Sequence, residues 1–267
     1  MLIVLLILPG LLAIAAVSLW LNAGKQLGRS PSGERLARLE TSLNFEKGVA
    51  QNPVPTDNSW GLVKTWNTLK DYRSGQKTVP DEPPPILELT RDSFAEKPVS
   101  GLRVTWLGHS SVLVEIDDKV ILFDPVFAER ASPFSFIGPR RFHPPPISLD
   151  DLPPLDAVVI SHDHCDHLDY EAVVHLATKT TAFIVPLGVG SHLEEWSISP
   201  ESIVELDWWE EVEVEEIRLT ACPARHFSGR SLFANRTLWA SWAVVGPVHR
   251  VFFSGDTGMM KLFGRVG

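Results

Sequence analysis

The chain has 267 residues, and 44% of them are hydrophobic. This length suits one large domain with an appendage, and the hydrophobic share is enough to build a sizeable core. A net charge of −9 without a basic stripe argues against nucleic acid as a partner, and two cysteines do not indicate a disulfide framework.

Residues 1–22 are almost entirely apolar, which predicts a membrane-spanning anchor. About 20 such residues are enough to cross a bilayer. A cleaved secretory signal is the alternative, but it favours a basic start and a shorter apolar core, and neither is present. Basic residues follow the segment and none precedes it, so the positive-inside rule predicts a single-pass, membrane-anchored protein with its catalytic domain in the cytoplasm.

Residues 23–100 are expected to form a linker and an N-terminal arm. A short helix is predicted within residues 32–43, and the prolines at 53, 55 and 83–85 exclude regular structure around them. Trp60, Val63, Trp66 and Leu69 recur at helical spacing. This pattern favours an amphipathic arm packed on the domain over a helix at the membrane surface.

Residues 101–267 are expected to form the main domain. Apolar patterns predict strands within 102–116, 119–123 and 156–160, and again at 183–185, 212–219, 239–245 and 248–253. A helix is predicted at 169–178, with Asp169 as its N-cap. Helices interleaved with the later strands indicate an α/β layered domain.

The run SHDHCDH at 161–167 directly follows the apolar strand 156–160. It places His162, His164 and His167 beside Asp166, and imidazole nitrogens and carboxylate oxygens are zinc ligands. A loop at the end of a buried strand can hold such ligands in a fixed arrangement. The motif therefore predicts a metal site. Cys165 lies inside it, and a non-ligating thiol is favoured over a thiolate ligand because the other side chains suffice.

Two further polar clusters follow apolar strands in the same manner. His226 comes after the strand that ends near residue 220, and Asp256 comes after residues 251–253. Each alone is an ordinary loop residue, but beside the first motif both become candidates for a shared site.

Asp124, the motif at 162–167, His226 and Asp256 resemble, in this order, the motifs of the metallo-β-lactamase superfamily. Longer strings are similar to its family of N-acyl-phosphatidylethanolamine-hydrolysing phospholipases D. They are WLGHSSVLVE at 106–115, DPVF at 124–127, GPRRFHPPPIS at 138–148, LDWWE at 206–210, LWASW at 238–242 and FSGDTG at 253–258. The resemblance covers residues 102–267.

This resemblance implies an α/β (α+β) fold, a four-layer αββα sandwich with two zinc ions at one edge of its sheets. Asp124 would orient the ligand loop by hydrogen bonds without contacting a metal ion. His109 would lie near the site, with no role assigned. The implied zinc ligands are His162, His164 and His226 for the first ion, Asp166 and His167 for the second, and Asp256 for both.

The chain departs from the family pattern at one point. The family's last zinc ligand is a histidine beyond the FSGDTG string, and no histidine follows residue 258 here. His249 precedes that string and cannot fill the role. The hydrolase domain at 101–267 is therefore expected to be C-terminally incomplete, with its second zinc site one ligand short. An inactive, membrane-bound zinc-binding fragment stays open as an alternative.

The resemblance implies zinc-dependent phosphodiester hydrolysis of a membrane phospholipid. In the implied reaction, Asp166 and Asp256 position a hydroxide between the metals, and N-acyl-phosphatidylethanolamine yields an N-acylethanolamine and phosphatidic acid. A lactonase, or a phosphodiesterase with a soluble substrate, is the enzymatic alternative. A nuclease is disfavoured by the charge of −9.

The expected partners are a phospholipid substrate and the membrane, with a second copy of the chain as a further candidate and no nucleic acid. Phe134, Phe136 and Ile137, with the prolines at 144–146, form either an apolar surface for acyl chains or the packing of a long loop. Three arginines are candidates for phosphate contacts, with solubilising surface residues as the alternative: Arg140, Arg141 and Arg225.

Overall fold

The computed structural model describes residues 23–56, 64, 66–67, 70–71, 81–230 and 233–265. The anchor predicted at 1–22 lies outside these residues, and so do Trp60, Val63 and Leu69 of the predicted arm. Trp66 is helical and exposed. Within the part of the chain that is described, no helix is both long and apolar enough to cross a membrane.

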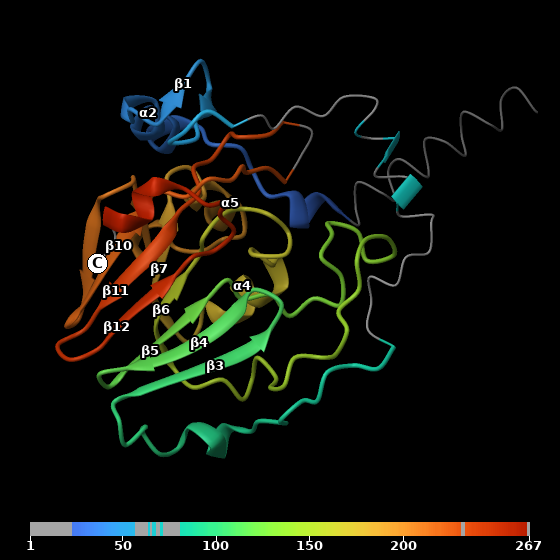
Figure 1. Ribbon diagram of the computed structural model, residues 1–267, viewed down its shortest axis with the longest axis vertical. Helices are drawn as coiled ribbons and strands as arrows, with labels where there is room; N and C mark the ends of the chain where they lie inside the picture. The colour runs from blue at the N-terminus through green and yellow to red at the C-terminus, as the bar shows by residue number, and fades with distance from the viewer. Residues whose placement is uncertain are drawn as a thin grey trace, which may run out of the picture.

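Helix α2 (Gly33–Thr41) and a small hairpin of the N-terminal arm lie at one end of the domain (Figure 1). Helix α2 confirms the helix predicted within 32–43 and leads into strands β1 (Phe45–Glu46) and β2 (Val49–Ala50), which pair antiparallel. Leu39 of α2 is fully buried in the main core. This part of the arm is therefore packed into the domain.

A six-stranded mixed sheet forms the first half of the domain. Its strands lie in the order β3-β4-β5-β6-β7-β8, antiparallel from β3 to β5 and parallel from β5 to β8. The central strands are rich in Val, Ile and Leu and are buried on both faces, as parallel strands usually are. The strands are β3 (Leu102–Gly108), β4 (Ser111–Ile116), β5 (Lys119–Phe123), β6 (Leu155–Val159), β7 (Thr180–Pro186) and β8 (Ile203–Leu206).

A four-stranded antiparallel sheet, in the order β12-β11-β10-β9, forms the second half. The single strand predicted at 212–219 is wrong, because the chain reverses at Glu215, where φ is 56°, and makes a hairpin instead. Neither Gly nor Pro marks this turn in the sequence. The strands are β9 (Glu211–Val214), β10 (Ile217–Cys222), β11 (Ser241–Val245) and β12 (Arg250–Phe253).

Two helices cover one face of the six-stranded sheet: α4 (Tyr170–Leu176) and α5 (Gly190–Glu195). Asp169 caps α4 as predicted, because its carboxylate accepts a hydrogen bond from the backbone N–H of Glu171 at 3.1 Å. Three short 3₁₀ helices connect or end other segments: η1 (Arg91–Phe94), η2 (Pro200–Ser202) and η3 (Lys261–Arg265).

Strand β5 shows how alternation builds two cores. Ile121 and Phe123 join the core between the two sheets, whereas Leu122 joins the core beneath α4 and α5. Trp242 of β11 is fully buried in the first core. Leu193 of α5 is fully buried in the second. The two cores hold helices, the six-stranded sheet and the four-stranded sheet as successive layers.

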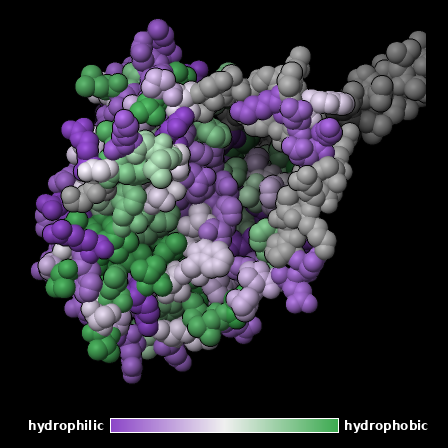
Figure 2. Space-filling model, in the orientation of Figure 1, coloured by the Kyte–Doolittle hydropathy of each residue, from purple (hydrophilic) through white to green (hydrophobic). Residues whose placement is uncertain are grey.

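The outer face of the four-stranded sheet is where the expected fourth layer belongs. In the described part of the chain, no α-helix covers this face, and η3 reaches it through the ring of Phe263, which meets Phe252 of β12 edge to face. Figure 2 shows apolar side chains gathered over β11 and β12. The mixed α/β fold is as expected, with three of the four layers formed by described elements.

Candidate metal centre

Four loops that follow strand ends meet at one edge of the two sheets. Strands β5 and β6 are parallel neighbours, and β10 and β12 both run antiparallel to β11, so within each pair the carboxyl ends share an edge. Four polar segments follow these ends: Asp124 after β5, residues 161–167 after β6, His226 after β10 and Asp256 after β12.

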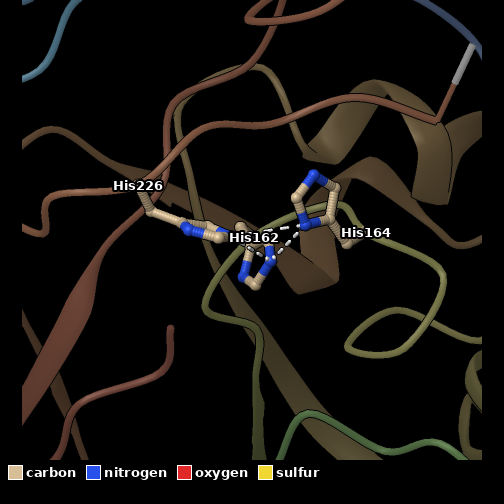
Figure 3. A group of neighbouring side chains, drawn as sticks. All are labelled: His162, His164 and His226. Atoms are coloured by element: carbon tan, nitrogen blue, oxygen red, sulfur yellow. Dashed lines mark hydrogen bonds between the residues drawn. The ribbon is translucent and has the colours of Figure 1, made fainter. Parts of the chain in front are cut away.

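Three histidine rings converge at this edge, as Figure 3 shows. Nε2 of His162 lies 2.9 Å from Nδ1 of His164 and 3.2 Å from Nε2 of His226. The remaining pair, Nε2 of His226 and Nδ1 of His164, is 3.3 Å apart. Three ring nitrogens therefore face a common point.

This triangle has the size of a metal site. Nitrogen ligands that sit about 2.0–2.1 Å from a tetrahedral metal are about 3.3 Å from one another. The observed separations run from 2.9 to 3.3 Å. The three histidines therefore fit one metal ion of the zinc type.

The tautomer of His162 suits a ligand. The hydroxyl of Ser161 donates to Oδ2 of Asp124 at 2.6 Å, so its oxygen is left to accept from Nδ1–H of His162 at 2.9 Å. With its proton on Nδ1, the His162 ring presents an unprotonated Nε2 to its two partners.

A second group of side chains lies beside the first. Nε2 of His109 is 3.1 Å from Oδ2 of Asp166, and one ligand atom each of His109, Asp166 and His167 lies within 4.8 Å of the others. Asp256 lies between the groups, with carboxylate oxygens 3.4 Å from Nε2 of His167 and 3.8 Å from Nε2 of His226. Asp256 is therefore within reach of a histidine from each group.

The buried carboxylate of Asp124 forms hydrogen bonds to residues of the motif. Asp124 is fully buried and adopts a left-handed backbone conformation with φ of 42°. Its carboxylate accepts from the backbone N–H of Ser161 at 2.7 Å and pairs with Nδ1 of His167 at 2.7 Å. These bonds hold the start and the end of the motif on one carboxylate.

Burial keeps the three converging histidines neutral. It lowers the pKa of His162 well below the ordinary value, lowers that of His164, and lowers that of His226 to about 4, with neighbouring imidazoles adding to the effect. Neutral imidazole is the form that binds a metal ion.

The acidic residues are held in their charged form. Burial alone raises the pKa of the Asp166 carboxyl, but the hydrogen bond from His109 and the charge of His167 outweigh it and bring the pKa well below its usual range. The hydrogen bond from His167 also lowers the pKa of Asp256. These ionised carboxylates give the site the negative charge that a divalent cation needs.

His167 itself behaves differently from the other three. Burial lowers its pKa, but the carboxylate of Asp124 overcomes this and raises the pKa to about 10. Without a metal ion, His167 is therefore a cation bonded to Asp124 and Asp256 at neutral pH.

Some roles within the motif had no distinct signal in the sequence. Ser161 and Asp163 look like ordinary loop residues, and only the folded structure reveals their buried hydrogen bonds. Cys165 belongs to none of the metal-binding groups found among the described residues, and burial raises the pKa of its thiol. His249 pairs with Asp117 at the opposite end of β12 from Asp256.

A family model described as a beta-lactamase superfamily domain matches residues 119–266 of this chain. The chain belongs to this superfamily. The resemblance seen in the ordered motifs is thereby confirmed, and the superfamily accounts for the mixed α/β sandwich with candidate metal ligands at its edge.

Three relatives illustrate the similarity. An uncharacterized protein of Mycobacterium tuberculosis is 51% identical over 234 residues, which cover 85% of this chain and 61% of that protein. The N-acyl-phosphatidylethanolamine-hydrolyzing phospholipase D 1 of Caenorhabditis elegans is 40% identical over 238 residues, 82% of this chain and 66% of the relative. A metal-dependent hydrolase of Saccharolobus solfataricus is 31% identical over 170 residues, 61% of this chain and 66% of the relative. The chain spans less than two thirds of the length of these relatives.

Proposed function

We propose that this chain is a zinc-dependent phosphodiesterase of the phospholipase D type, which cleaves N-acyl-phosphatidylethanolamine to an N-acylethanolamine and phosphatidic acid. The observation that carries the proposal is the triangle of ring nitrogens of His162, His164 and His226, 2.9 to 3.3 Å apart, beside ionised carboxylates. The similarity to the nematode phospholipase D supports the substrate class.

The proposed ligands follow the two groups of the site. His162, His164 and His226 would hold the first zinc ion, Asp166 and His167 would hold the second, and Asp256 would contribute to both. When bound, zinc supplies Lewis acidity and an activated water at neutral pH.

The protein's own residues prepare that chemistry. Asp166 and Asp256 hold the attacking water in line with phosphorus and accept its proton. His109 fixes the Asp166 carboxylate through their 3.1 Å hydrogen bond. Asp124 keeps His167 and Ser161 in place through hydrogen bonds to its carboxylate. No side-chain nucleophile is required, so we expect no covalent intermediate.

An apolar cavity beside the site supports a lipid substrate. Its volume is about 360 Å³, and its wall includes His109, Trp106, Val126, Pro139 and Phe142. Because His109 bonds to Asp166, the cavity opens next to the proposed second zinc. It is suited to an acyl chain whose phosphate sits at the metals.

Exposed apolar side chains lie in the loop 131–143, which contributes part of the wall of this cavity. Phe136, Ile137 and Phe142 are each more than half exposed. They favour contact with a bilayer over simple packing of the loop. Together with the predicted anchor in residues 1–22, they support a membrane-associated protein with its catalytic domain on the cytoplasmic side. A homodimer stays a prediction.

The arginines near the cavity have other partners. Arg141 donates to the backbone oxygens of Val126 at 2.7 Å and Leu107 at 3.2 Å. Arg140 forms an ion pair with Glu129. Arg225 donates to Thr56 at 2.9 Å. We therefore assign phosphate binding to the metal ions and give these arginines structural roles.

The substitution His164→Ala tests the proposal. We expect the full chain, purified in detergent and loaded with Zn²⁺, to release N-acylethanolamine and phosphatidic acid from N-acyl-phosphatidylethanolamine in mixed micelles. Removing one of three converging ligands should lower this rate by about 100-fold or more. Mass spectrometry of both products measures it.

The control is His175→Ala in the last turn of α4, where His175 pairs with Asp150 at the surface. It should retain the wild-type rate. Undiminished turnover by His164→Ala would show that the reaction does not depend on this centre. Cleavage of a lactone in place of the phospholipid would identify the alternative hydrolase.

A further inference from the structure

Asp163 lies between two proposed zinc ligands, yet its carboxylate serves other partners. The side chain is 3% exposed and accepts hydrogen bonds from three separate segments. Oδ1 accepts from the backbone N–H of Gly229 at 2.6 Å, and Oδ2 accepts from the hydroxyl of Thr237 at 3.0 Å. Gly229 follows His226 by three residues. Asp163 therefore joins the loop of His162 and His164 to the loop of His226.

The third donor to Asp163 is His192 of α5, whose Nε2 lies 3.2 Å from Oδ2. The other ring nitrogen, Nδ1, accepts from the backbone N–H of Arg29 at 3.1 Å. A nitrogen that accepts carries no proton, so the proton of His192 is on Nε2 and is donated to Asp163. The hydrogen bond from Arg29 thus selects the tautomer that Asp163 requires.

Arg230 completes this buried arrangement. Its Nη1 donates to the backbone oxygen of Asp163 at 2.8 Å and to that of Leu168 at 2.6 Å. Its guanidinium also lies 5.3 Å from the ring centroid of Trp196. Arg230 therefore holds the backbone on both sides of residues 164–167. We call Asp163, His192 and Arg230 the loop clasp.

The N-terminal segment at 25–29 supplies partners to the loop clasp and its neighbour. Besides the bond from Arg29 to His192, the backbone oxygen of Gln26 accepts from Nε of Arg230 at 2.8 Å. The backbone oxygen of Lys25 accepts from Nε1 of Trp196 at 2.6 Å. The segment is thus bonded to two of the three clasp residues.

Gly28 makes this close approach possible. Its φ is +61°, and a Cβ at this position would lie 2.3 Å from Nδ1 of His192. Any side chain here would displace His192 or lift the segment away. Gly33 has a similar φ of +58°, but nothing lies within 4 Å of its added Cβ. Substitution strains the backbone similarly at both glycines, but only at Gly28 does the added Cβ meet His192.

We propose that residues 25–29 are a positioning element of the metal centre, acting through the loop clasp on the two loops that carry His162, His164 and His226. The inference rests on the proposed function, because it presumes that these histidines bind zinc. The segment directly follows the apolar residues 1–22 in the chain. The predicted membrane anchor and the metal centre are thereby linked through a few buried hydrogen bonds.

The test compares Gly28→Ala with Gly33→Ala in the full chain. Zn²⁺ is titrated into the metal-free proteins in competition with a chromophoric chelator. We expect Gly28→Ala to bind the first zinc about 10- to 100-fold more weakly than the wild type, as when residues that support metal ligands are lost. Gly33→Ala should bind as tightly as the wild type. The Co²⁺-loaded spectrum should shift in Gly28→Ala alone, because the ligand geometry changes.

A measurement on the unaltered chain keeps the test independent of variant folding. Coupling is reciprocal, so zinc that benefits from the docked segment must also stabilise its docking. Hydrogen exchange at residues 25–29 should therefore slow on addition of Zn²⁺.

The outcomes separate the two proposals. If the wild-type chain binds no zinc, the proposed function is wrong. If it binds zinc while both glycine variants match it and exchange at 25–29 is unchanged, the metal centre stands and the positioning role is wrong. If Gly28→Ala does not fold, the exchange result on the wild type decides.

Discussion

Asp124 and His167 form the pair on which the proposed second zinc depends. Their side chains are almost fully buried, with Nδ1 and Oδ2 at 2.7 Å. The carboxylate raises the pKa of His167 to about 10 against the opposing effect of burial. At neutral pH and without a metal ion, His167 is therefore protonated, although it must be neutral to bind a metal ion.

Zinc binding to the second site should release one proton at pH 7. His167 is charged below its folded pKa of about 10, so release is complete at neutral pH and disappears as the pH rises through that value. His162 and His226, whose pKa values burial lowers, contribute none. Calorimetry of Zn²⁺ binding in buffers of different ionisation enthalpy counts the protons.

The matched variant is Asp124→Asn. Without the Asp124 carboxylate, only Asp256 opposes the effect of burial, so the pKa of His167 should fall and the second zinc should bind with less proton release. Asparagine tolerates the left-handed backbone of Asp124, which limits the change to charge and hydrogen bonding. Equal proton counts in both proteins would contradict this assignment.

At the scale of elements, two turns hold the sheets together at the end away from the metal centre. Asp117 between β4 and β5 accepts from the backbone N–H groups of Val248 and His249, both at 2.9 Å, and contacts Nδ1 of His249 at 2.6 Å. A Cβ on Gly246 would lie 2.2 Å from this carboxylate. Glycine there permits the close approach of the β11–β12 turn.

We expect Asp117→Asn to destabilise the fold at neutral pH but not in strong acid. The hydrogen bond from His249 lowers the Asp117 pKa to about 2, against about 3.9 in unfolded chains. The unfolded state thus binds more protons in this window, and stability falls as the pH drops through it. Thermal unfolding of wild type and Asp117→Asn between pH 2 and 6 should show a difference in Tm that shrinks below about pH 4.

Asp118→Asn is the control for this experiment. Asp118 is the neighbouring turn residue, also left-handed, and its side chain is 70% exposed in an ion pair with Lys97. Its substitution should change the Tm little at any pH, because exposed ion pairs stabilise weakly. If the Tm difference between the wild type and Asp117→Asn is the same at every pH, ionisation of Asp117 does not cause the loss of stability.

At the scale of the whole molecule, the candidate metal centre combines proposed ligands from both sheets. His162, His164 and His167 follow β6 of the six-stranded sheet, whereas His226 and Asp256 follow β10 and β12 of the other. A bound ion therefore connects the two sheets at one edge, while the turn of Asp117 connects them at the opposite end.

Zinc should consequently stabilise the whole domain. At a free concentration 100 times Kd, a ligand specific for the folded state contributes about 2.7 kcal/mol. For a domain of this size that corresponds to a rise in Tm of about 5–10 °C. Calorimetric scans with Zn²⁺ and with a chelator measure it. Mg²⁺, which prefers oxygen ligands, should have a much smaller effect, and an equal effect would argue against a histidine-rich site.

Much of the fold was predictable because its signals are local. Alternating apolar residues marked β4, apolar runs marked β5 and β6, and Asp169 marked the start of α4. The hairpin of β9 and β10 was missed because its turn at Glu215 has neither Gly nor Pro, and its only mark in the sequence is a one-residue shift of the apolar positions, from Val212 and Val214 to Ile217 and Leu219. The motif at 161–167 indicated a metal site because four candidate ligands lie within six residues of one loop.

The sequence by itself determined the superfamily, most strands and the residue types of the metal centre. Only the tertiary structure decided that His226 reaches His162 across 64 positions, that His109 bonds to Asp166 across 57, and that Asp163 holds two loops and α5 together. The reason is physical. Secondary structure follows from side chains that are neighbours in the sequence. These contacts depend instead on the order of the strands in each sheet, and the strand ends come together only when both cores are packed.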